Sequence, residues 1–322
     1  MKQDFEIVSY GATNLKILFA NILYRTPHVH KDFEFGYVLD HDMDIMIPGQ
    51  TYSLHPGDMW ITNPFQSHEI KAKRLPSLSL IVQIPASFFM GFYKQIDNLE
   101  FTDFLFSKET HPMNETAILP LMLQMAAHYF RTSEFYEIKC AALLNECLFQ
   151  LLTFAGYRFV SEKERLATKA KAVRMRSILQ YIDDNYHGKL LLSDIAQHED
   201  LSLYYLSHLF KSSLGMPFQE YLLRFRCEKA RCLLLSTDHS LLDISIDCGF
   251  SDLKYLNSGF LRQYNYTPKE YRSRFARDEL YSQPESMTTP RGFVTTEYAI
   301  GEILSAKSSL LMLERLQKGI GV

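Results

Sequence analysis

The chain has 322 residues, of which 47% are hydrophobic and 22% are charged. This length is enough for two domains, and the composition is that of an ordinary globular protein rather than a disordered or fibrous one. No apolar run reaches the length of a membrane span, and the first residues lack the basic and apolar regions of a signal peptide. We therefore expect a cytoplasmic protein that does not bind membranes.

The distribution of charge indicates a class of binding partner, and the cysteines indicate whether disulfides or a zinc site are present. Residues 165–280 carry 17 Lys and Arg against 14 Asp and Glu, whereas the rest of the chain carries 17 against 23. This asymmetry favours contact between the C-terminal part and a polyanion.

Five cysteines without a CxxC pair argue against a disulfide scaffold or a zinc site, so we expect buried free thiols. They are Cys140, Cys147, Cys227, Cys232 and Cys248.

The first part of the chain is predicted to consist of short strands. Residues 29–47 are rich in Phe, Tyr, Val and Ile, and Pro-Gly pairs at 48–49 and 56–57 mark turns. The pattern over residues 87–110 is mixed. We assign residues 1–110 to one β domain.

Helical periodicity begins near residue 115, and we assign residues 111–159 to a helical segment. An apolar stripe at three- and four-residue steps consists of Leu144, Cys147, Leu148, Leu151 and Leu152. This segment either covers the β domain or pairs with its twin in a dimer. The charged residues 160–171 are interpreted as an interdomain linker, either extended or helical.

Residues 172–278 are dense in helical periodicity and are predicted to form an all-α domain. Residues 279–322 form a C-terminal extension whose order the sequence leaves open. Residues 282–292 contain two prolines and several Ser and Thr, so they are predicted to be loose. The amphipathic residues 298–316 either dock on the body or stay mobile.

The all-α region contains an internal repeat, in which residues 191–221 return as residues 241–271. The offset is 49 at two serines and 50 elsewhere, which places an extra residue just after the second serine. Each copy is predicted to form a helix, a tight turn and a second helix. The matched positions include Ser202 with Ser251, Tyr205 with Tyr255, Leu206 with Leu256, and Phe210 with Phe260.

Each copy also carries signals for the start and stop of its second helix. Ser202 and Ser251 are predicted to cap these helices, and Gly215 and Asn265 to end them in the left-handed conformation. Gly249 is predicted to supply the turn of the second copy. A single helix-turn-helix pattern is weak evidence, but two copies at one period strongly favour DNA binding.

The outward positions of the two second helices are predicted to contact DNA. Asn can read an adenine edge and Leu can touch a thymine methyl group, whereas Lys211 and Arg262 suit phosphates. Residues 221–235 are predicted to form a spacer helix with an apolar side and a basic side, which sets the distance between the two readers. The predicted DNA-binding residues are Tyr204, Ser207, His208, Lys211, Leu253, Lys254, Asn257, Ser258 and Arg262.

Residues 172–277 resemble the DNA-binding domain of the AraC/XylS family of bacterial transcription regulators. The resemblance implies a seven-helix domain that uses both recognition helices. The chain departs from the family pattern at Glu199 and Ser245, and at Ser258 and Leu261, where basic residues are common; we therefore expect a weaker DNA contact from the second unit. The motifs are Arg224-x-Arg226-x-x-x-Ala230-x-x-Leu233-Leu234, Gly249-Phe250-Ser251-Asp252, Tyr255-Leu256 to Phe260, and Thr267-Pro268-x-x-Tyr271-Arg272.

Residues 15–85 are similar to the cupin-type sensor domain of many such regulators. This similarity implies a cupin-like β-barrel and dimerisation through the helical segment, with Leu144, Leu148, Leu151 and Leu152 as the seam. The motifs that carry it are His28-x-His30-x-x-x-Glu34, Leu54-x-Pro56-Gly57-Asp58 and Asn63-Pro64-x-x-x-His68.

The His and Glu residues of these motifs have two interpretations. As in cupin enzymes, they could ligate iron, manganese, zinc or nickel. Sensor domains of regulators keep the signature without a metal, and we favour this interpretation, with no metal and no cofactor. Aromatic rings beside hydrogen-bonding groups suit a sugar or a similar polar metabolite. The predicted ligand-binding residues are Arg25, His28, His30, Glu34, Tyr37, Trp60 and His68.

These observations predict an α+β multidomain protein with an N-terminal cupin-like β-barrel, a helical dimerisation segment and a C-terminal all-α domain with two helix-turn-helix units. The predicted function is a sequence-specific transcription regulator, not an enzyme, controlled by a small polar effector in the barrel. The expected partners are promoter double-stranded DNA, a carbohydrate-like effector, a second copy of the chain and RNA polymerase. The alternatives are a metal-dependent cupin enzyme fused to a DNA-binding domain and a ligand-independent dimeric activator.

Overall fold

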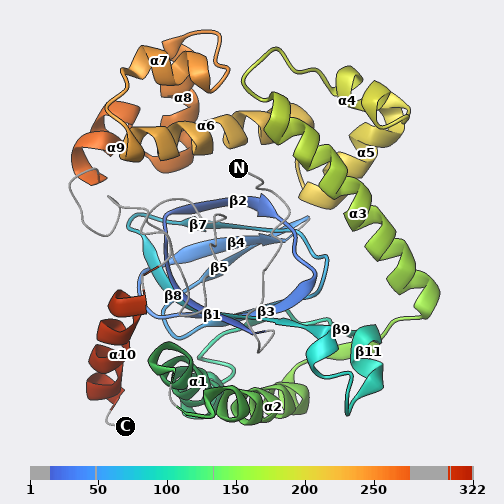
Figure 1. Ribbon diagram of the computed structural model, residues 1–322, viewed down its shortest axis with the longest axis vertical. Coiled ribbons are helices and arrows are strands. Elements are labelled where there is room, and N and C mark those ends of the chain that lie inside the picture. Colours follow the sequence, from blue (N-terminus) through green and yellow to red (C-terminus); the bar gives the residue numbers. More distant parts are fainter. Residues whose placement is uncertain (1–14, 48, 133, 276–303, 305, 321–322) are drawn as a thin grey trace.

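The computed structural model describes residues 15–47, 49–132, 134–275, 304 and 306–320, and it combines β-sheets in the N-terminal part with helices in the C-terminal part (Figure 1). The strands are β1 (Lys16–Ile22), β2 (Tyr24–His28), β3 (Asp32–Val38), β4 (Met43–Ile47), β5 (Gln50–Leu54), β6 (Met59–Thr62), β7 (His68–Ala72), β8 (Ser77–Pro85), β9 (Leu99–Phe101), β10 (Leu105–Phe106) and β11 (Tyr157–Phe159). The α-helices are α1 (Leu119–Arg131), α2 (Tyr136–Phe154), α3 (Glu162–Asn185), α4 (Leu192–His198), α5 (Leu203–Leu214), α6 (Phe218–Ser236), α7 (Leu241–Asp247), α8 (Leu253–Tyr264), α9 (Pro268–Phe275) and α10 (Ala306–Ile320). Shorter helical turns are Ala86–Phe88, Lys94–Asn98 and Asn114–Ile118.

The strands pair antiparallel in two main sheets. One has the order β1-β8-β3-β6-β10 and the other the order β2-β7-β4-β5, while β9 pairs with β11. Within the described residues, no backbone ladder joins the two main sheets. The predicted closed barrel is therefore wrong, because apolar packing between two facing sheets replaces backbone closure.

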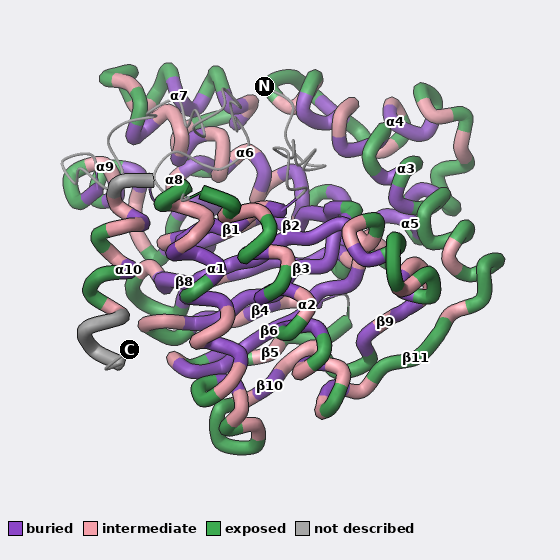
Figure 2. The backbone as a smooth tube through the Cα atoms, turned by 60° about the horizontal axis from the view of Figure 1, so that its bottom comes forward, coloured by how far each residue is buried: buried purple, intermediate pink, exposed green. Residues whose placement is uncertain are grey.

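Side chains of the five-stranded sheet alternate between two cores. Ile17 and Phe19 of β1 join a core shared with α1 and α2, whereas Leu18 and Ala20 join a core between the sheets that also contains Ile45 of β4. This period of two is the geometry of an extended strand. Because both faces are covered, β3 and β8 are buried along their whole length (Figure 2).

The helices form layers on both sides of the paired sheets. Helices α1 and α2 pack on the five-stranded sheet, and α6 lies over the four-stranded sheet, with α3 running along one side (Figure 1).

Helix α3 begins with a capping box in which Ser161 and Glu164 bond reciprocally. Residues 162–171 are thus the first turns of a continuous helix.

The apolar stripe of α2 packs inside the chain. Leu144 and Leu151 are fully buried and Leu148 nearly so, all in the core that α1 and α2 share with β1 and β3. Leu152 is partly buried against the same core. The predicted dimer seam is therefore wrong, because these side chains already have a sheet to cover.

The C-terminal helix α10 docks on the body. Leu313 is fully buried in the core that α1 and α2 share with the five-stranded sheet, and the backbone N–H of Leu304 donates to the carbonyl of Phe19 in β1 at 2.9 Å. Of the two alternatives for the amphipathic residues 298–316, docking is the one observed for the described residues 304 and 306–316. The predicted loose residues 282–292 lie outside the described residues.

The five cysteines are free thiols, four of them buried and Cys232 partly exposed. Burial raises the pKa of Cys147 to about 12, so this thiol stays protonated at neutral pH.

Across the described part of the chain, no helix has the length and apolar character needed to cross a membrane.

Gly36 in β3 tests the packing between the sheets. A Cβ atom at this position would lie 2.0 Å from Cζ2 of Trp60, whose ring is fully buried. We expect Gly36→Ala to lower the free energy of unfolding by about 1–3 kcal/mol, because the ring must move out of a packed core. Urea unfolding monitored by fluorescence of Trp60, the only tryptophan, measures this loss. Gly91→Ala is the control, since its Cβ would meet no atom within 4 Å; equal midpoints for the two variants would contradict the prediction.

Candidate nucleic-acid interface and buried histidine cluster

Two helix pairs form the repeated units of the C-terminal part, α4 with α5 and α7 with α8. Ser202 caps α5 by accepting from the backbone N–H of Tyr205 at 3.2 Å, as predicted. Helix α8 is capped by Asp252, which accepts from Tyr255 at 3.0 Å, so the predicted cap Ser251 is wrong. The extra residue lies in the turn before α8, and the two caps are therefore related by the same offset of 50 as the helices they start.

The residues predicted to end the second helices do so in the left-handed conformation, with φ of 75° at Gly215 and 62° at Asn265. Gly249 also has a positive φ of 75°, and a Cβ there would lie 2.4 Å from the carbonyl oxygen of Tyr186. Only glycine allows this approach between the second turn and the end of α3.

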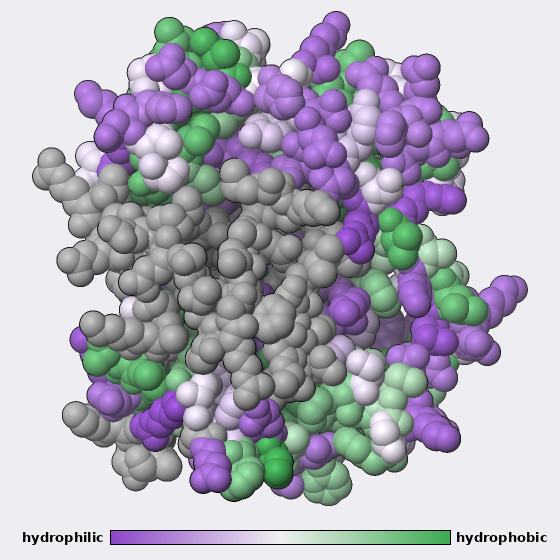
Figure 3. Space-filling view, in the orientation of Figure 1, coloured by the Kyte–Doolittle hydropathy of each residue, from purple (hydrophilic) through white to green (hydrophobic). Residues whose placement is uncertain are grey.

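The nine predicted DNA-binding side chains all lie on the outer sides of α5 and α8. Those of α5 are exposed, and on α8 only Leu253 and Asn257 are partly buried. Leu206, Phe210, Leu256 and Phe260 are buried on the inner sides. The face drawn in Figure 3 is largely hydrophilic over α3, α4 and α5.

The basic side of α6 contacts protein. Arg226 donates to the carbonyls of Tyr186 and Gly188 at 2.8 and 2.7 Å. Lys229 pairs with Asp183 at 2.6 Å, and the buried Arg231 pairs with Glu228 at 2.8 Å. Glu228 in turn accepts from the hydroxyl of Tyr264 at the end of α8. These basic residues bind α6 to the end of α3, and Glu228 connects α6 to α8.

Two basic residues of α3 lie beside α5, and sequence reasoning missed them. Lys171 donates to the hydroxyl of Ser212 at 3.0 Å, and Arg174 donates to that of Tyr205 at 3.3 Å. Both line a groove between α3 and α5 together with Tyr204 and His208. The signal was the run of basic residues from 163 to 176, which we divided between the linker at 160–171 and the start of the all-α domain.

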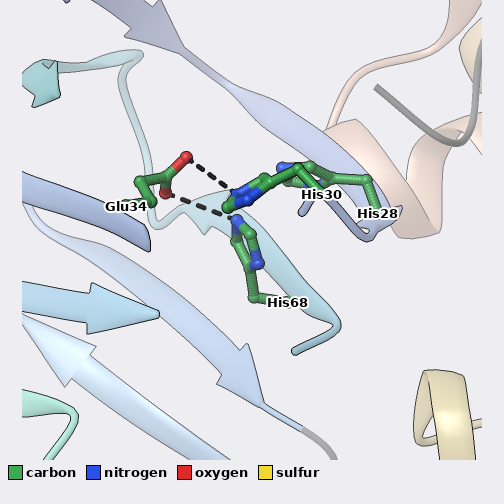
Figure 4. A group of neighbouring side chains, drawn as sticks. All are labelled: His28, His30, Glu34 and His68. Atoms are coloured by element: carbon green, nitrogen blue, oxygen red, sulfur yellow. Dashed lines mark ion pairs between the residues drawn. The ribbon is translucent and has the colours of Figure 1, made fainter. Parts of the chain in front are cut away.

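In the N-terminal part, three histidines and one glutamate form a buried histidine cluster (Figure 4). His28 ends β2, His30 follows it, and His68 starts β7, while Glu34 comes from β3 in the other sheet. All four are buried, and one possible ligand atom from each lies within 4.8 Å of those of the others. The cluster thus bridges the two sheets.

Each histidine of the cluster has its Nδ1 fixed by a backbone carbonyl. The acceptors are the carbonyls of Thr26 for His28, Asp32 for His30 and Gln66 for His68, at 2.9, 2.9 and 3.2 Å. A carbonyl oxygen only accepts, so each Nδ1 carries a proton. The Nε2 atoms of His30 and His68 lie 3.4 and 3.3 Å from the two oxygens of Glu34.

Two neutral donors hold the carboxylate of Glu34. Trp60 donates from Nε1 at 3.0 Å and Gln83 from Nε2 at 2.9 Å. Burial alone would raise the pKa of Glu34, but His68 and His30 outweigh it and hold this pKa well below its usual value. Burial lowers the pKa of His28 well below its usual value, and His68 and Arg25 add to this effect. Glu34 is therefore ionised and His28 neutral.

The predicted ligand-binding residues do not all converge. Trp60 and the cluster lie between the sheets, and Arg25 is close enough to His28 to influence its pKa. The pairing of β2 with β7 shifts register between Arg25 and His28. Tyr37 belongs to the core on the opposite face of β3, so its prediction as a co-lining residue is wrong. It is three residues from Glu34, and strand neighbours at odd spacing point to opposite faces.

The outer face of β2 and β7 contacts the C-terminal helices. Arg224 of α6 forms an ion pair with the buried Glu69 of β7 and lies 3.5 Å from the hydroxyl of Tyr24 in β2. Lys71 donates to the carbonyl of Arg262 at 3.3 Å. Arg262 itself pairs with Glu220 of α6 at 3.0 Å.

Comparisons with known proteins match both parts of the chain. A family model described as a helix-turn-helix domain matches residues 195–274. The HTH-type transcriptional activator RhaS of Salmonella heidelberg is 25% identical over 248 residues, covering 76% of this chain and 87% of that protein. The regulatory protein PocR of Salmonella typhimurium is 37% identical over 114 residues, 35% of this chain and 37% of that protein.

Among solved structures, ToxT from Vibrio cholerae O395 is 13% identical, with a TM-score of 0.45 and coverage of 81% of this chain and 97% of that one. The helix-turn-helix match falls on the capped units described above, and the RhaS alignment spans most of the chain. Residues 195–274 thus form a helix-turn-helix DNA-binding domain, and the chain as a whole resembles DNA-binding transcription regulators of the AraC/XylS family.

Proposed function

We propose that this protein is a sequence-specific transcription regulator, and not an enzyme, whose two reading helices α5 and α8 enter neighbouring turns of the major groove. The observation that carries the proposal is the pair of capped helix-turn-helix units, each with an exposed outer face. On each unit the buried inner side packs against α6, so the outer side is available to DNA.

Seven of the nine outward residues divide into two roles. Asn257 and Leu253 of α8 suit base edges, and Tyr204 and His208 of α5 suit the same role on the first unit. Lys211, Lys254 and Arg262 suit phosphates, which position the protein without specifying sequence. Arg262 is engaged by Glu220, so it must exchange this partner to reach a phosphate. This exchange and the loss of basic residues at 258 and 261 both support a weaker second unit.

We also propose that the N-terminal part controls DNA binding in response to a small polar, sugar-like molecule. The contacts of Glu69 and Lys71 with α6 and α8 support this role, because they connect the sheets to a reading helix.

A homodimer and RNA polymerase remain proposed partners. With the α2 stripe buried, the exposed Ile138 and Phe149 of α2 are the better candidates for a dimer surface.

Footprinting with the full-length chain tests the function. We expect protection of two patches on one face of the duplex, about one helical turn or ~34 Å apart, because a single chain presents two readers. Protection should be sequence-selective at low salt. Absence of selective protection, with and without candidate sugars, would contradict the proposed function.

Two substitutions separate base reading from phosphate contact. We expect Asn257→Ala to cost about 1–3 kcal/mol of specific binding and to relax one base position, whereas Lys211→Ala should weaken specific and non-specific binding alike. Fluorescence anisotropy with an operator and its single-base variants measures both. Lys139→Ala on α2 is the control, since this exposed residue lies far from the readers in sequence and fold. Equal loss on all duplexes for Asn257→Ala would overturn the assignment.

A thermal-shift screen with sugars, polyols and aromatic acids tests the effector. A ligand at about 100 times its Kd stabilises the folded protein by about 2.7 kcal/mol, so we expect one chemical class to raise the unfolding temperature. If no compound raises it, the protein is a ligand-independent activator instead.

A further inference from the structure

We propose that the groove between α3 and α5 binds the phosphate backbone of DNA, with Lys171 and Arg174 of α3 as the residues that neutralise its charge. The α3 side of this groove lies outside residues 195–274, which the helix-turn-helix family model matches. The inference rests on the proposed function, because it adds a second source of DNA contact to the first reading unit.

The first observation is that the α3 side of the groove is a continuous helix. Residues 162–171 are helical and run on into the rest of α3, which passes alongside α5 (Figure 1). Lys171 and Arg174 lie three positions apart and therefore project from one face of α3. Ala167 and Ala170 line the groove beside them, and their short side chains leave it open. The two cations are thus held at a fixed position relative to α5.

The second observation is that the positive charge of the groove has no acidic partner. Among the described residues, no Asp or Glu lines the groove, and neither Lys171 nor Arg174 forms an ion pair. Their partners are the neutral hydroxyls of Ser212 and Tyr205, at 3.0 and 3.3 Å. By contrast, three basic residues of α6 pair with carboxylates. The groove therefore offers two uncompensated positive charges to an anion.

The third observation is the position of these charges beside the reading face. Tyr204 and His208 belong to the outward side of α5 and also line the groove. A helix in the major groove lies between two phosphate backbones, so cations at its flank meet phosphates. Helix α5 itself contains a single Lys or Arg, which is Lys211, and no Asp or Glu. The α3 residues therefore supply most of the positive charge of the first reading unit.

The hydroxyl contacts leave both cations able to bind a phosphate. A phosphate oxygen carries a charge that a hydroxyl lacks, so it replaces the hydroxyl as the stronger partner. Arg174 contacts Tyr205 through Nη1, and its guanidinium has further N–H donors for a bidentate phosphate contact. Such contacts position α5 on the duplex without reading its sequence. They add affinity at every site alike.

The test measures how DNA binding by the full chain depends on salt, with a duplex recovered by in vitro selection and an unrelated duplex. Each neutralised phosphate contributes about 0.9 to the slope of log Kd against log salt concentration. We expect Lys171→Ala and Arg174→Ala each to lower this slope by ~0.9 on both duplexes, and the double variant to lower it by ~1.8. The affinity advantage of the wild type over the double variant should shrink about tenfold between ~50 and ~200 mM salt.

Lys169→Ala is the matched control for these variants. Lys169 is an exposed lysine of the same helix, two positions from Lys171, so it projects away from the groove. We expect this variant to keep the wild-type slope. An equal loss of slope for Lys169→Ala would show a general effect of charge and overturn the site. Unchanged slopes for Lys171→Ala and Arg174→Ala, with DNA still bound, would also overturn it and leave the proposed function in place.

A second pair of variants separates a DNA contact from a structural role of the same cations. Ser212→Ala and Tyr205→Phe remove the hydroxyls that Lys171 and Arg174 contact, but they keep both charges. We expect them to keep the wild-type slope, and all variants to unfold at the wild-type midpoint. If loss of the hydroxyls lowers affinity as much as loss of the charges does, the cations act through protein contacts and the inference is wrong.

Hydroxyl-radical footprinting locates the contact on the duplex. Asn257→Ala identifies the patch of the second unit, because Asn257 lies on α8. The double variant should lose protection beside the other patch and keep protection at the second. Loss confined to the second patch would overturn the placement beside α5. Absence of DNA binding by the wild type would contradict the proposed function and the inference with it.

Discussion

A buried carboxylate, that of Glu34, organises the space between the two sheets. An ionised carboxylate taken out of water costs several kcal/mol unless donors or cations surround it. Trp60 and Gln83 supply the donors, and three histidines turn toward the same point. The position of Trp60 has a further consequence, because its ring lies against Gly36 and leaves no space for a side chain there. The need of the Glu34 carboxylate for a buried donor thus places Trp60 of β6 against Gly36 of β3 and fixes how these two strands pack.

In the DNA-binding part, helix α6 has the corresponding organising role. Its basic side resembles a nucleic-acid surface in the sequence, but Arg226, Lys229 and Arg231 are used to bind α3, α8 and α6 itself. This arrangement holds both helix-turn-helix units on one rigid support. The proposed DNA contact therefore rests on the outer sides of α5 and α8, which have fewer charges than the sequence of the region suggests.

The two parts of the molecule meet on β2 and β7. These strands carry the histidine cluster on their inner side and the contact with Arg224 on their outer side. Since strand residues alternate in direction, neighbours such as His68 and Glu69 connect two different environments over a single peptide bond. This arrangement places the histidine cluster and the contact with α6 on opposite sides of the same two strands, as the proposed control of DNA binding requires.

Local features were determined by the sequence itself. The helix starts and stops at Ser202, Gly215 and Asn265 followed from backbone preferences that neighbouring residues set. The repeat also predicted two helix-turn-helix units, because each copy contains the residues that form its own turn and end its own second helix. The clustering of His28, His30, Glu34 and His68 was implied by the resemblance to cupin-type domains.

Only the tertiary structure decided the choice of partner for each surface. The α2 stripe could cover a sheet or a second chain, and the available sheet face took it. The extra residue before α8 moved its cap from Ser251 to Asp252. Periodicity shows that a face is apolar or that a helix begins nearby. It does not show what lies opposite, because that depends on contacts between residues far apart in the chain.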